Sequence, residues 1–181
     1  IFCQNYKINH SVMGIEADEE TLCRIMLDLQ HQGAHNINLV TPAPHVPLIA
    51  RTLPLARQTG LTIPVVYNTN AYENVQTLKM LEGLIDIYLP DFKYVSSLLA
   101  KRYSDAEDYF AIAAQAIAEM YRQVGNIKLD ENGMAASGVL IRHMVLPGCV
   151  DDTRRVLDYV SANYPKNIYI SIMSQYAPTR D

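Results

Sequence analysis

The chain has 181 residues, of which 49% are hydrophobic and 19% are charged, and its formal net charge is −4 at pH 7. This composition favours one folded domain with one core over a disordered chain. Because the sequence has no long basic run, neither a nucleic acid nor an anionic membrane is expected as a partner. No apolar stretch approaches the roughly 18 residues that cross a bilayer, so we expect a cytoplasmic protein.

Hydrophobic periodicity and turn residues predict helices that alternate with strands. Pro54 is expected to kink or break its helix, and Ser104-x-x-Glu107 is typical of a capping box at the start of a long helix. In chain order, the pattern predicts a helix at 18–33, a strand at 37–40, a helix to about 60, a strand at 63–67, a helix at 73–81, a strand at 85–89, a helix at 104–125, a strand at 139–146, a helix at 152–161 and a strand at 168–173.

Strands separated by helices favour a parallel sheet, because parallel strands need a crossover connection. The sequence therefore predicts an α/β fold, either a barrel or a doubly wound sheet. Ligands of such proteins bind at the carboxyl ends of the strands. Polar residues gather at those ends here, which predicts one shared site. They are Thr41, Asn68, Thr69, Asn70, Asp91, Lys93, Gln175 and Tyr176.

Side-chain parity adds an arginine to this site. Asp91 and Lys93 continue the odd-numbered side of the strand at 85–89, and Arg142 lies inside the predicted strand at 139–146. An arginine in a buried strand requires an anionic partner. His143 has the opposite parity, so we expect it to pack on the other face of the sheet.

Six short runs carry a resemblance to a known family. They are CQNY at 3–6, TPAPHVP at 41–47, VVYNTNAYE at 65–73, IDIYLPDFKY at 85–94, RHMVLPG at 142–148 and SQYAP at 174–178. In this order they resemble radical S-adenosylmethionine (radical SAM) proteins similar to pyruvate formate-lyase activating enzymes. The resemblance implies that residues 1–181 form a single partial domain, an incomplete parallel (β/α)6-type TIM-like barrel whose first strand is missing.

The family binds a [4Fe-4S] cluster through a C-x3-C-x2-C loop, and S-adenosylmethionine binds the open iron. Cys3 matches the third cysteine of that loop, and Phe2 matches the aromatic residue before it, whose neighbourhood meets the adenine. The other two cysteines would precede Ile1, so the chain is expected to be truncated within the loop. Cys23 and Cys149 are poorly placed to substitute. Since a cluster of this kind needs three protein thiolates, the fragment is not expected to hold one.

The resemblance also gives roles to residues of the predicted sheet edge. Lys93 would reach the carboxylate of S-adenosylmethionine, and Asp91 would help to hold a monovalent cation beside it. Arg142 would serve the carboxylate or the ribose. Six further residues are implied in binding the cofactor. They are Thr41 in place of a Gly-Gly-Glu turn, Asn68-Thr69-Asn70 in place of Asp-Thr-Asn before a glycine, and Gln175 with Tyr176 closing the adenosyl pocket.

The implied activity is reductive cleavage of S-adenosylmethionine to a 5′-deoxyadenosyl radical, which abstracts hydrogen from a glycine of a partner glycyl-radical enzyme. Flavodoxin or ferredoxin would supply the electron. Two other classes stay open, a barrel lyase that forms a Schiff base at Lys93 and a non-catalytic domain that binds a small carboxylated ligand. Taken alone, Asp91 with Lys93 is more typical of a local ion pair, and Arg142 can also be explained as part of a structural salt bridge.

Overall fold

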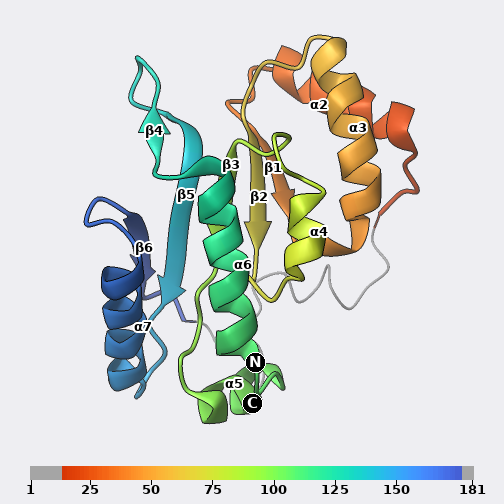
Figure 1. Cartoon of the computed structure of the whole chain (residues 1–181). Coiled ribbons are helices and arrows are strands. Elements are labelled where there is room, and N and C mark those ends of the chain that lie inside the picture. Colours follow the sequence, from red (N-terminus) through yellow and green to blue (C-terminus); the bar gives the residue numbers. More distant parts are fainter. Residues whose placement is uncertain (1–13, 177–181) are drawn as a thin grey trace.

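The computed structural model describes residues 14–176 (Figure 1). It forms an α/β fold with one mostly parallel sheet, as predicted. The strands are β1 (Ile37–Val40), β2 (Val65–Thr69), β3 (Ile87–Pro90), β4 (Lys128–Leu129), β5 (Ala135–Met144) and β6 (Tyr169–Met173). The helices are α2 (Glu19–His31), α3 (Val46–Gln58), α4 (Val75–Lys79), α5 (Ser97–Ser104), α6 (Tyr109–Val124) and α7 (Val150–Asn163), with a 3-10 turn at Ala43–His45.

Five strands run parallel in the order β1, β2, β3, β5, β6. The short β4 pairs antiparallel with the start of β5, whereas β6 pairs with residues 140–144 of β5. Within residues 14–176, β1 pairs only with β2 and β6 only with β5, so the described strands form an open sheet. In this part of the chain, no helix has the length and apolar character needed to cross a bilayer.

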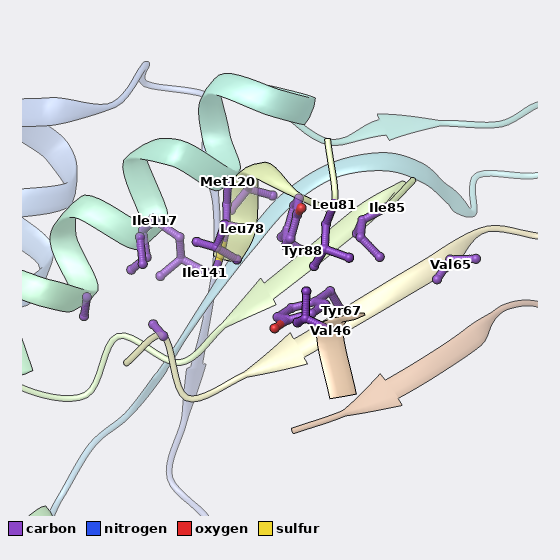
Figure 2. Packing of buried hydrophobic residues seen from close by; sticks show 14 of the residues in the cluster. Val46, Val65, Tyr67, Leu78, Leu81, Ile85, Tyr88, Ile117, Met120 and Ile141 are labelled. Atoms are coloured by element: carbon purple, nitrogen blue, oxygen red, sulfur yellow. The ribbon is translucent and has the colours of Figure 1, made fainter. Parts of the chain in front are cut away.

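The main core lies between one face of the sheet and the helices, with buried residues from α2, α3, α4, α6 and α7. The helices α4 and α6 lie in front of the strands in Figure 1. Tyr67, Tyr88 and Val139 are in register on three neighbouring strands, project to this face and are fully buried. Figure 2 shows Leu78 of α4 and Met120 of α6 packed beside Tyr88. Residues of the opposite parity therefore project to the other face of the sheet.

One ion pair, between Arg57 of α3 and Asp86, stabilises the amino-terminal edge of the sheet. The carboxylate oxygen Oδ2 of Asp86 accepts hydrogen bonds from Arg57 Nη2 at 2.5 Å and from the backbone N–H of Val65 at 2.7 Å. Arg57 also donates to the carbonyls of Leu61 and Ile63. Because these contacts hold the chain ahead of β2, the strand starts at Val65, two residues later than predicted, and extends through Thr69.

Two local expectations on the helices differ from the structure. Pro54 does not break its helix, and α3 runs without interruption from Val46 to Gln58 with Leu53 and Ala56 fully buried beside an exposed Pro54. Tertiary burial thus outweighs the missing backbone donor. Ser104 does not cap the long helix either. It ends α5, a helix that the pattern missed, and its hydroxyl pairs with that of Tyr94.

A carboxyl group is buried in the core near the end of β2. Glu73 is 5% exposed, and it accepts hydrogen bonds from the hydroxyls of Thr69 at 2.6 Å and Tyr67 at 3.2 Å. Burial raises the pKa of Glu73, although these two donors oppose the shift. The folded state therefore binds the Glu73 proton more tightly than the unfolded state does.

This raised pKa predicts how a Glu73→Gln variant depends on pH. The stability that protonated Glu73 contributes is fully present below its unfolded pKa of about 4.3 and is lost as the pH rises through the higher folded pKa. Glutamine keeps an acceptor for both hydroxyls and carries no charge. Urea unfolding across this pH range should therefore show the variant becoming progressively more stable than the wild type as the pH rises.

The exposed Glu131→Gln in the turn between β4 and β5 is the matched control, and it should show no such trend. A stability difference between Glu73→Gln and the wild type that stays constant with pH would contradict the assignment.

Candidate functional site

The carboxyl ends of β2, β3 and β5 bring four polar side chains together. Arg142 Nε lies 2.9 Å and Nη2 lies 2.6 Å from Asp91 Oδ1, and Nη2 also donates to Asn68 Oδ1 at 2.8 Å. Lys93 Nζ is 3.9 Å from Asp91 Oδ2. We call Asn68, Asp91, Lys93 and Arg142 the Arg142 cluster. Asp91 is thus the anionic partner that an arginine within a strand requires.

Strand register explains why these side chains meet. Asp91 and Arg142 form a parallel bridge just beyond the end of β3, and Asn68 is in register with Leu89. Leu89 and Asp91 have the same parity, so Asn68, Asp91 and Arg142 project to the same face of the sheet. This is the face opposite the main core.

The cluster has an excess of positive charge. Two cationic side chains face one carboxylate, and the side chains of Arg142, Asp91 and Lys93 are between 22% and 27% exposed. Partial burial strengthens their electrostatic interactions relative to water. Guanidinium and ammonium groups held in this way are suited to bind a ligand carboxylate by charge-assisted hydrogen bonds.

A buried histidine fixes the segment that carries Lys93. His143 is 2% exposed, its Nδ1 lies 2.7 Å from the carbonyl oxygen of Phe92, and its Nε2 lies 2.9 Å from Thr153 Oγ1. Since a carbonyl only accepts, the Nδ1 atom carries the hydrogen. His143 packs on the helix-covered side of the sheet, as its parity predicted.

Asp152 of α7 holds the same segment further along. Its carboxylate accepts the backbone N–H groups of Val95 at 3.1 Å and Ser96 at 2.8 Å, just before α5. Asp152 is 7% exposed, so these hydrogen bonds satisfy a buried charge. The backbone on the carboxyl side of Lys93 is therefore anchored to a helix more than 50 residues away in sequence.

Tyr109, the first residue of α6, joins the two turns that carry the cluster. Tyr109 is 2% exposed, and its hydroxyl shares one hydrogen between the carbonyl of Asn70, at 2.9 Å, and the carbonyl of Asp91. The same hydroxyl accepts the backbone N–H of Lys93 at 3.1 Å. Tyr72 stacks on this ring, with centroids 6.2 Å apart. The helix predicted at 104–125 includes Tyr109, but the sequence pattern did not indicate this polar role.

The structure does not bring every predicted residue into the cluster. Thr69 projects to the core and bonds Glu73, whereas Asn70 is exposed and its Oδ1 accepts the N–H of Tyr72 at 2.9 Å. Thr41 reaches the cluster only through its backbone N–H, which donates to the carbonyl of Asn68 at 2.8 Å.

The remaining predicted residues lie near the chain ends. Gln175 is exposed and Tyr176 is partly buried, and both follow β6 at the edge of the sheet where the cluster lies. Cys3 and Phe2 lie outside the described residues. Between residues 14 and 176, no group of three His, Cys, Asp or Glu side chains could hold a metal ion, and Cys23 and Cys149 are free thiols. The described residues therefore do not themselves form an iron-sulfur site.

Comparison with known proteins finds a distant homologue. The chain is 29% identical over 188 residues to "Uncharacterized protein MJ0674" of Methanocaldococcus jannaschii, and the match covers 98% of this chain and 50% of the relative. The chain thus spans about half the length of the curated relative it matches. No family model matches the chain.

The position of Tyr109 predicts the effect of removing its hydroxyl. Tyr109→Phe removes the hydroxyl that bonds the N–H of Lys93 and the carbonyls of Asn70 and Asp91, which should lower the free energy of unfolding by about 1–3 kcal/mol. Hydrogen exchange followed by NMR should show that the Lys93 amide loses protection under native conditions.

Tyr88→Phe is the matched control, because it removes another buried hydroxyl, the one that bonds Gln123 at 2.7 Å, away from the cluster. Equal loss of protection of the Lys93 amide in both variants would show that the Tyr109 hydroxyl does not specifically stabilise the turn that carries Lys93.

Proposed function

We propose that this chain is part of a radical SAM enzyme of the type that resembles pyruvate formate-lyase activating enzymes, with the sheet forming the incomplete barrel that the resemblance implies. One observation carries the proposal. Asn68, Asp91, Lys93 and Arg142 come from three separate motifs of that resemblance, and they meet at the carboxyl edge of a parallel sheet. Ligands of parallel α/β proteins bind at this edge.

The cluster suits the amino-acid end of S-adenosylmethionine. Lys93 and the remaining N–H groups of Arg142 bind the carboxylate. Asp91 orients both cations, since its carboxylate lies 3.9 Å from Lys93 Nζ and 2.6 Å from Arg142 Nη2. Thr41 and Asn70 line the adjoining turns, and Gln175 with Tyr176 close the adenosyl side. In this proposal Thr69 acts through the backbone and through Glu73 rather than by direct contact with the ligand.

The iron-sulfur part of the proposal rests on Cys3 and Phe2. A [4Fe-4S] cluster needs two thiolates beyond Cys3, and the proposal places them in the C-x3-C-x2-C loop of the resembled family. When bound, the cluster supplies one electron that cleaves the sulfonium to methionine and a 5′-deoxyadenosyl radical. The hydrogen atom that this radical takes comes from a glycine of a partner glycyl-radical enzyme, and flavodoxin or ferredoxin delivers the electron in the cytoplasm.

A chain extended to complete the loop tests the iron-sulfur part. With cysteines placed directly before Ile1 and four residues further upstream, anaerobic reconstitution with iron and sulfide should give a brown protein. In the presence of dithionite, this protein should convert S-adenosylmethionine to 5′-deoxyadenosine. Cys3→Ser in the same extended chain should abolish both results. A protein that stays colourless, or that is brown and does not cleave S-adenosylmethionine, would contradict the proposal.

Binding measurements test the role of Lys93 and separate the alternatives. Loss of one charge-assisted contact should weaken binding of S-adenosylmethionine to Lys93→Gln by about 10- to 100-fold. Binding of methylthioadenosine, which lacks the amino and carboxyl groups, should be unchanged. The control Lys128→Gln alters an exposed lysine of β4 and should bind both compounds as the wild type does.

The two other functional classes predict different results for the same protein. A Schiff-base lyase predicts a carbonyl substrate that borohydride traps on Lys93, and a non-catalytic binding domain predicts ligand binding that does not depend on iron. Equal affinity of Lys93→Gln and the wild type for S-adenosylmethionine would remove Lys93 from the proposed site.

A further inference from the structure

We infer that the Arg142 guanidinium supplies the positive charge of this site and occupies the position where a monovalent metal ion would have to bind. The resemblance implies such an ion beside Asp91, and the residues of this chain do not fit it. In the structure, Arg142 Nη2 lies 2.6 Å from Asp91 Oδ1 and 2.8 Å from Asn68 Oδ1. One guanidinium nitrogen therefore occupies the position from which an ion would bridge the ends of β2 and β3.

The backbone oxygens around this position already accept hydrogen bonds. Tyr109 donates to the carbonyls of Asn70 and Asp91, the N–H of Asp91 donates to the carbonyl of Thr69 at 2.8 Å, and the N–H of Thr41 donates to that of Asn68 at 2.8 Å. Alkali and alkaline-earth ions are held by cages of several oxygen ligands. Each of these carbonyl oxygens already uses one of its two lone pairs in a hydrogen bond, so an ion bound here would have to compete with these bonds.

The charge at the site also disfavours a metal ion. Asp91 carries the one formal negative charge of the cluster, and it already faces the guanidinium of Arg142 at 2.6 Å and the ammonium of Lys93 at 3.9 Å. Asn68 contributes a neutral amide. A third cation at this position would be repelled by two positive groups and attracted by one carboxylate.

A guanidinium differs from a metal ion in being part of the chain. Arg142 comes from β5, so its contacts link the ends of three strands and cannot be lost by dilution or dialysis. The cluster should therefore keep its geometry whichever monovalent salt is present. This inference concerns the folded chain alone, so it can fail while the proposed function stands, and the reverse also holds.

Thermal unfolding in different salts tests the inference without iron or S-adenosylmethionine. The wild type should have the same Tm, within about 1 °C, in KCl, NaCl and choline chloride at equal ionic strengths of about 0.1 M. The double variant Asn68→Asp with Arg142→Gln removes the guanidinium and places a second carboxylate at position 68. Its Tm should be about 3 °C higher in KCl than in choline chloride, because an ion that binds only the folded state stabilises it.

Two further measurements keep the test decisive. Arg154→Gln removes an exposed arginine that pairs with Asp151 at 2.9 Å, and it should show no dependence on the cation. Thallium(I), an NMR-active substitute for K⁺, should give no bound signal with the wild type and a bound signal with the double variant. Bound thallium or potassium-specific stabilisation of the wild type would overturn the inference, even if the double variant fails to fold. A folded double variant whose Tm is the same in KCl and in choline chloride would overturn the inference as well.

Discussion

The ion pair between Arg142 and Asp91 is the contact on which the site depends. It joins the end of β5 to the end of β3, and the additional hydrogen bond to Asn68 extends the link to β2. Without this pair, the partly buried Arg142 guanidinium would keep only the neutral amide of Asn68, and Asp91 only the more distant Lys93, which is costly. The ion pair thus fixes the strand ends and orients the cationic groups that the proposed carboxylate ligand would meet.

The sheet is fastened differently at its two edges. At the amino-terminal edge, Arg57 and Asp86 satisfy backbone groups around the start of β2, and these contacts serve the packing of α3. At the carboxyl edge, Tyr109 and Asp152 use buried polar atoms to hold the turns on either side of Lys93. A turn anchored in this way places its side chains with little freedom, as the binding of a polar ligand requires.

The part of this arrangement that follows from periodicity could be predicted from the sequence. Period-two alternation is enough to put Arg142 and His143 on opposite faces of one strand, whereas the meeting of Asp91 and Arg142 on one face also depends on the register between neighbouring strands. It could not predict the role of Tyr109 or Asp152, since each acts on residues far away in sequence through backbone atoms, and a pattern of side chains carries no sign of such contacts. Thr69 shows the same limit. Its place in β2 depends on where the strand ends, and that end is set by hydrogen bonds to neighbouring strands.

The most direct test of the central claim compares S-adenosylmethionine with its decarboxylated analogue, which lacks the carboxylate that Arg142 and Lys93 are proposed to bind. If the Arg142 cluster holds this group, the extended, reconstituted protein should bind the analogue about 10- to 100-fold more weakly, and Arg142→Gln should reduce this difference. Equal affinities of the wild type for the two compounds would contradict the account.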